Sequence, residues 1–115
     1  MELKTINQCL IVGLVQAGGK IKTFEDGSAV ANFQIMTQGY KASMDGKSEH
    51  TAEYTNIQVY NQVYDDLYSL IIEGNYVLVR GPLKTHNYVD KNKRPRQFIM
   101  VMAKDISLMT RVKDL

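Results

Sequence analysis

Tryptophan is absent from this 115-residue chain, which has only one cysteine and two prolines. The single cysteine, Cys9, cannot form an internal disulfide, and its place in the apolar run CLIVGLV favours a buried small side chain over a reactive thiol. No basic stretch followed by an apolar one opens the chain, and no segment approaches the roughly 18 apolar residues that span a bilayer. We therefore expect a soluble, intracellular protein in the cytoplasm, with no membrane partner.

The remaining composition is that of an ordinary globular protein, with 44% hydrophobic and 23% charged residues. Its length suits one compact domain, which we expect to span residues 1–110, with residues 111–115 as a short C-terminal end. The net charge is only +2, so total charge argues weakly for a polyanionic partner. The positions of the charges must decide that question.

The first half of the chain alternates between apolar and polar residues. This pattern predicts strands at residues 8–17 and 29–37, joined by a short excursion near residues 20–24. A polar segment with a turn near Asp45 and Gly46 then leads into a third strand around residues 52–62. The second and third strands should therefore form a long hairpin.

The second half begins with a change of period. Residues 63–73 carry apolar side chains at helical spacing, and Gly74 suits the end of a helix. Alternation returns at residues 75–85 and 97–109, which predicts two more strands separated by a basic loop. Five strands with one short helix between the third and the fourth predict an all-β protein with the OB-fold, a five-stranded Greek-key barrel.

Three of the predicted strands have one apolar face and one face of amides, cations and tyrosines. On the third strand, Ile57 and Val59 share the apolar face. We assume here that the pleat of the fourth strand continues past Pro82. The polar faces then carry Asn32, Gln34, Gln38 and Tyr40 on the second strand, Tyr54, Asn56, Gln58 and Tyr60 on the third, and Arg80, Lys84, His86 and Tyr88 on the fourth.

This combination is typical of proteins that hold single-stranded nucleic acid, because bases stack on aromatic rings and phosphates contact lysine or arginine. The loop between the last two strands adds cations at a place where OB-folds commonly contact oligonucleotides. Those cations are Lys91, Lys93, Arg94 and Arg96. The sequence thus predicts a nucleic-acid-binding face.

Two other interpretations remain open. A single tyrosine on a half-buried strand is most often a packing residue, and the tyrosines could instead form a dry interface with another protein. An enzyme has the least support, since His50 and His86 lie apart without metal-ligand spacing, and no Ser-His or glycine-rich phosphate motif occurs. We expect no catalytic residue, metal ion or cofactor.

Several short motifs carry a family resemblance. LIVGLV, GSAVANFQIMT, EYTNIQVYNQ, IIEGNYVLVRGPLKT, NYVD and DISLM occur in this order over roughly residues 5–109. Together they resemble the bacterial and phage single-stranded DNA-binding protein family. That resemblance implies an OB-fold protein that coats and protects single-stranded DNA without sequence specificity during replication, recombination or repair, at the nucleoid.

The resemblance also implies particular residues and an assembly. Family members stack DNA on aromatic residues at positions that match Tyr40, Tyr54, Tyr60 and Tyr88, although most members have tryptophan at three of them. It implies a homotetramer whose N-terminal strands pair between subunits, with a dimer as the alternative. The ending TRVKDL lacks the acidic tail through which many members recruit replication and repair proteins. An accessory primosomal protein that works mainly by docking other proteins is therefore the alternative function.

Overall fold

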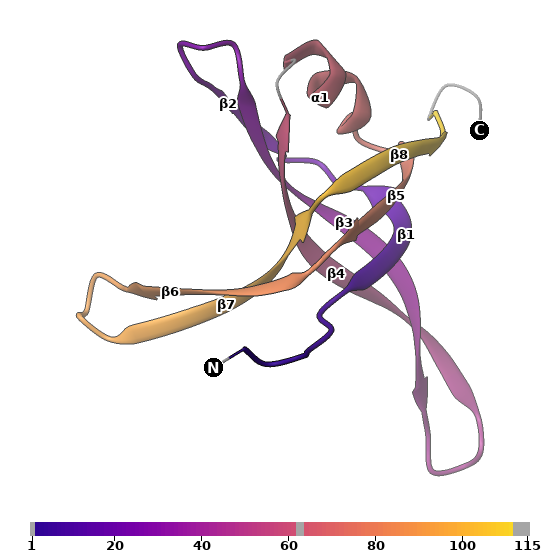
Figure 1. Cartoon of the computed structure of the whole chain (residues 1–115). Coiled ribbons are helices and arrows are strands. Elements are labelled where there is room, and N and C mark those ends of the chain that lie inside the picture. Colours follow the sequence, from indigo (N-terminus) through magenta and orange to yellow (C-terminus); the bar gives the residue numbers. More distant parts are fainter. Residues whose placement is uncertain (1, 62–63, 112–115) are drawn as a thin grey trace.

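A computed structural model describes residues 2–61 and 64–111 of the chain. Most of them lie in strands (Figure 1). In chain order the elements are β1 (Cys9–Val15), β2 (Lys20–Thr23), β3 (Ala29–Ala42), β4 (Ser48–Asn61), α1 (Tyr64–Leu70), β5 (Tyr76–Gly81), β6 (Leu83–Val89), β7 (Pro95–Ala103) and β8 (Asp105–Thr110). The prediction of an all-β fold with one short helix is confirmed.

All five predicted strands are present. The first three correspond to β1, β3 and β4. The fourth predicted strand is divided at Pro82 into β5 and β6, and the fifth is divided at Lys104 into β7 and β8. The excursion before the second strand is itself a short strand, β2, which pairs with β3. The OB-fold prediction therefore holds, with bends that the alternation pattern did not show.

The sheet has the strand order β6-β7-β4-β3-β1-β5-β8. All pairs are antiparallel except β4 with β7, which pair in parallel. The end of β5 meets β7, where the Met102 N–H donates to the Pro82 carbonyl at 2.9 Å. A Cβ atom on Gly81 would lie 2.1 Å from the Met102 carbonyl oxygen, so only glycine allows this approach.

The core lies inside the barrel and is built from the inward residues of the strands. Ile35, Ile57 and Val79 are almost completely buried there, together with Leu67 of α1. Cys9 is half-buried and packs against this cluster, in keeping with its interpretation as a small apolar side chain. The alternation of β3 and β4 therefore fixes which face of each strand remains available to a ligand.

The helix α1 is shorter than the predicted span of residues 63–73, of which residue 63 lies outside the described part of the chain. It ends at Leu70 because the buried Asn75 side chain donates to the Ser69 carbonyl at 3.0 Å and to the Leu70 carbonyl at 3.3 Å. Gly74 does adopt a positive φ, 88°, but several residues beyond the helix. The predicted helix end was wrong because a buried amide satisfies the last carbonyls earlier.

Three hairpins extend from the barrel in different directions: β2–β3, β3–β4 and β6–β7 (Figure 1). The β3–β4 hairpin turns at the predicted place, where the Ser43 N–H donates to the Lys47 carbonyl at 2.8 Å and Gly46 has a φ of 82°. The β2–β3 and β6–β7 hairpins lie on either side of the β3–β4 pair in the sheet order. They therefore flank the face that carries the tyrosines.

Candidate nucleic-acid interface

The register of β3 with β4 brings three of the four predicted tyrosines, Tyr40, Tyr54 and Tyr60, to one face of the sheet. Partners in an antiparallel pair point to the same side, and Met36 is opposite Tyr54, Val30 opposite Tyr60, and Tyr40 opposite His50. All four predicted tyrosines are exposed: Tyr40 by 68%, Tyr54 by 56%, Tyr60 by 61% and Tyr88 by 46%. Their exposure leaves aromatic surface available for stacking.

Between the tyrosines, the same face carries a row of paired amides. Gln34 donates to the Asn56 side-chain oxygen at 3.0 Å, and Gln58 donates to the Asn32 side-chain oxygen at 2.9 Å. Cross-strand bonds of this kind hold the amides in fixed orientations. The two predicted contact residues Asn56 and Gln58 are thereby placed on the floor between Tyr54 and Tyr60.

Strands β7 and β6 extend this face sideways. Asn56 is the partner of Met100, so Phe98 of β7 lies on the same side, and the register of β6 with β7 adds Lys84, His86 and Tyr88. The Phe98 ring centroid lies 5.1 Å from that of His86 and 6.0 Å from that of Tyr88. These rings form an aromatic cluster between the middle of the β6–β7 hairpin and its tip.

Sequence reasoning did not identify Phe98. It has the same parity as Arg96 and Met100 within RQFIMVM, and that alternation was the available signal. The partnership of this parity with Asn56, however, depends on the parallel pairing of β4 with β7, which joins residues far apart in the chain. Alternation alone could not show that Phe98 belongs to the tyrosine face.

Strand β2 contributes cations that sequence reasoning also missed. Lys20 is the partner of Asn32 and Lys22 the partner of Val30, so both lysines lie on the tyrosine face. The Lys22 Nζ lies 5.6 Å from the centroid of the Phe24 ring. The sequence held a signal for these lysines, because Lys20 and Lys22 alternate with Ile21 in KIKT. Using it required the expectation that residues 20–23 pair with the second predicted strand.

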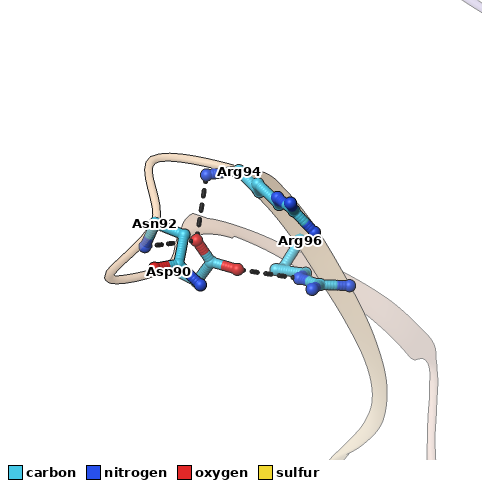
Figure 2. Close-up of polar contacts among 4 residues, drawn as sticks. All are labelled: Asp90, Asn92, Arg94 and Arg96. Atoms are coloured by element: carbon cyan, nitrogen blue, oxygen red, sulfur yellow. Dashed lines mark hydrogen bonds and ion pairs between the residues drawn. The ribbon is translucent and has the colours of Figure 1, made fainter.

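The turn between β6 and β7 is organised by Asp90 (Figure 2). One carboxylate oxygen accepts from the backbone N–H groups of Asn92 and Arg94, both at 2.9 Å, and the other accepts from the Arg96 Nε at 2.9 Å. Lys93 completes the turn with a φ of 61°. Arg96 is therefore paired with a carboxylate, whereas the Arg94 side chain points away from it (Figure 2).

These contacts change the acidity of Asp90. The backbone N–H of Arg94 and the Arg96 guanidinium favour the charged carboxylate and hold the pKa of Asp90 below its ordinary value. Asp45 in the β3–β4 turn behaves alike, because the Ser43 hydroxyl and the Lys47 N–H lower its pKa. Both turns therefore favour the ionised form of their aspartate.

Arg80 lies apart from the other predicted contact residues. Pro82 separates β5 from β6, and β5 pairs with β1 and β8 whereas β6 pairs with β7, so Arg80 does not lie beside the strands that carry Lys84 and Tyr88. Arg80 lies instead on β5 between β1 and β8, where its guanidinium forms an ion pair with Asp105. This position corrects the expected arrangement of the fourth strand.

The geometry defines a class of protein: an OB barrel whose exposed face combines aromatic rings, ordered amides and flanking cations. Residues 6–109 match the Single-strand binding protein family, and the chain belongs to that family. Among the described residues, no three histidine, cysteine or acidic side chains gather as a metal site, and no helix is long and apolar enough to cross a membrane.

Curated relatives are similar over most of the chain. A single-stranded DNA-binding protein of Bacteroides thetaiotaomicron is 22% identical over 108 residues, which cover 92% of this chain and 67% of the relative. Single-stranded DNA-binding protein 1 of Xylella fastidiosa is 20% identical over 113 residues, which cover 97% and 83% respectively.

Two solved structures share the fold. One is the Plasmodium falciparum SSB in complex with ssDNA, with a TM-score of 0.80, 24% identity, and coverage of 95% of this chain and 99% of that one. The other is a deletion mutant of the single-stranded DNA binding protein from Thermus aquaticus, with a TM-score of 0.73, 16% identity, and coverage of 90% and 50%. The barrel is thus that of single-stranded DNA-binding proteins.

Proposed function

We propose that this protein binds single-stranded DNA without sequence specificity and coats and protects it, without catalysing a reaction. The observation that carries the proposal is the single face on which β3, β4 and β6 expose four tyrosines, flanked by the cations of two hairpins. Membership of the Single-strand binding protein family supports it. The likeness to a structure described as an SSB complex with ssDNA agrees with the same conclusion.

Each kind of side chain on the face has a distinct part in this proposal. The tyrosine rings stack with bases, which is sequence-tolerant because every base has a π-face. The amides hydrogen-bond to base edges, and the cations contact phosphates, which makes binding sensitive to salt. The proposed contact residues are Tyr40, Tyr54, Tyr60, Tyr88, Asn56, Gln58, Lys84, Lys91, Lys93, Arg94 and Arg96, with Arg80 as a more distant cation.

We further propose that one domain, residues 1–110, carries this activity in the cytoplasm at the nucleoid, during replication, recombination or repair. The short end proposed for residues 111–115 lies mostly outside the described residues, which stop at residue 111. The alternative, a primosomal-type protein that works mainly by docking other proteins, has less support. A docking role does not explain why four exposed tyrosines lie on the same face as a row of paired amides.

Assembly as a homotetramer, or as a dimer, is part of the proposal. β1 pairs with β3 only at Leu14 and Val15, so residues 9–13 have no partner on that side within the described chain. An unpaired strand edge is a surface on which a second copy can add a strand. Leu10 and Val12 on this strand are exposed, which gives such a contact apolar surface.

The direct test is a titration of oligo-dT and of a duplex of equal length at several salt concentrations. We expect the single strand to bind much more tightly and its affinity to fall as salt rises. Light scattering of the free protein measures the mass of the assembly in the same samples. Equal affinity for the duplex would contradict the proposed function.

A further inference from the structure

One hollow of the tyrosine face lies between β2 and β7. The hollow has a volume of about 340 Å³, within the range of roughly 300–1,000 Å³ that small-molecule pockets occupy. Its floor is formed by β3 and β4, and its walls come from the turn before β2 and from β7. The lining residues that bear on a ligand are Lys20, Asn32, Gln34, Asn56, Phe98 and Met100.

The walls differ in chemistry. Phe98 keeps 37% of its surface exposed and lines one side with an aromatic ring, next to the buried thioether of Met100. Lys20 lines the opposite side from β2, and it is the partner of Asn32 on the floor. A nucleotide has the matching parts, because its base has a π-face and its phosphate is an anion.

The floor offers hydrogen bonds to a base edge. Gln34 uses its amide nitrogen and Asn56 its carbonyl oxygen to bond each other, at 3.0 Å. Within the described residues, the side-chain carbonyl oxygen of Gln34 and the side-chain amide nitrogen of Asn56 form no hydrogen bond, so one acceptor and one donor remain. The Watson–Crick edge of every base presents a donor beside an acceptor, so such a floor suits any base.

We propose that this hollow is a subsite for one nucleobase of the bound single strand, with Phe98 as its stacking wall. The inference rests on the proposed function and adds a base-binding residue to the four tyrosines. Phe98 lies between Tyr88 and the amide floor, so a strand that passes from the β6–β7 hairpin to β4 crosses the hollow. Lys20 binds the adjoining phosphate.

The test compares Phe98→Leu with the parent protein in binding oligo-dT and an equally long oligonucleotide made wholly of abasic sites. Leucine keeps apolar volume but removes the ring, so affinity for oligo-dT should fall by roughly 5-fold or more. Affinity for the abasic strand should not change, because that strand has no base to stack. Phe98→Tyr should bind like the parent, and Ile99→Ala, an exposed neighbour on the other face of β7, is the matched control.

A second measurement separates a subsite from mere support of Tyr88. The same Phe98→Leu change is made in a Tyr88→Ala background, where oligo-dT affinity should again fall by roughly 3-fold or more. No further loss in that background would overturn the inference, because Phe98 would then act only through Tyr88. Unchanged oligo-dT binding by Phe98→Leu in the parent would overturn it too, and would leave the proposed function intact. Failure of the parent to bind oligo-dT would overturn both.

Discussion

Tyr60 and Val59 are neighbours in β4, yet Tyr60 exposes 61% of its surface and Val59 only 4%. One strand thus serves the barrel core with one set of side chains and the proposed DNA face with the other. Because the pleat separates the two sets, stability and binding should respond to different substitutions along the same strand.

Tyr54→Ala or Tyr60→Ala should weaken binding to single-stranded DNA by about 1–3 kcal/mol, because each removes a stacking ring. Folding should be largely unaffected, since both side chains are exposed. Isothermal titration with oligo-dT measures the first effect and thermal unfolding the second. Tyr54→Phe and Tyr60→Phe, which keep the ring, should bind almost as well as the parent.

Ile57→Ala is the complementary change, because Ile57 is buried in the core. It should cost about 2–5 kcal/mol of unfolding free energy and leave binding per folded molecule nearly unchanged. If the tyrosine variants instead melted early and bound normally when folded, the tyrosines would be packing residues.

Asp90→Asn should increase affinity for single-stranded DNA. An asparagine oxygen can still accept from the Asn92 and Arg94 N–H groups, but the variant removes a negative charge and releases Arg96. If Arg96 then contacts a phosphate, the slope of log affinity against log salt should steepen by about 0.7. Asp90→Ala, which loses the turn bonds as well, is the comparison, and weaker binding by Asp90→Asn than by the parent would contradict this account.

The β6–β7 turn should loosen in acid. The folded state lowers the pKa of Asp90, so the folded protein binds this proton less readily than the unfolded chain. The stabilisation is present above the ordinary aspartate pKa, about 3.9, and is lost as the pH falls through the lower folded value. The backbone amide chemical shifts of Asn92 and Arg94, measured from pH 6 downward, should report this change. In Asp90→Asn these shifts should no longer depend on pH in this range, because the side chain does not titrate.

Asn75→Ala should destabilise the fold by about 1–3 kcal/mol, because it removes the buried amide that satisfies the Ser69 and Leu70 carbonyls. Binding to oligo-dT should remain, since Asn75 does not line the tyrosine face. Chemical denaturation measures the loss. Ser69→Ala, which removes only an exposed hydroxyl bond to the Asp66 carbonyl, should stay within about 0.5 kcal/mol of the parent.

Val12→Glu should reduce the mass of the assembly measured by light scattering. The side chain is exposed on β1, whose edge is unpaired at residues 9–13 within the described chain, and a carboxylate there disfavours an apolar contact with a second copy. Met44→Glu at the tip of the β3–β4 hairpin, where the side chain is fully exposed, is a control that should keep the parent mass. An unchanged mass for Val12→Glu would exclude this edge as the interface.

The sequence by itself determined the barrel type and the faces of β3 and β4. Side chains alternate strictly along an extended chain, so the burial of Ile57 and Val59 necessarily sends Tyr54 and Tyr60 outward. The hairpin tip at Gly46 was equally local, since a turn with positive φ favours glycine. Such features depend on neighbours in the chain, which a single sequence displays.

Only the tertiary structure decided which distant strands share the face. The parallel pairing of β4 with β7 joins Phe98 to the tyrosines, and the separation of β5 from β6 at Pro82 removes Arg80 from them. The end of α1 likewise depends on where the Asn75 side chain is buried. Alternation reports the side to which a residue points but not the strand beside it, because strand pairing is chosen by the packing of the whole barrel.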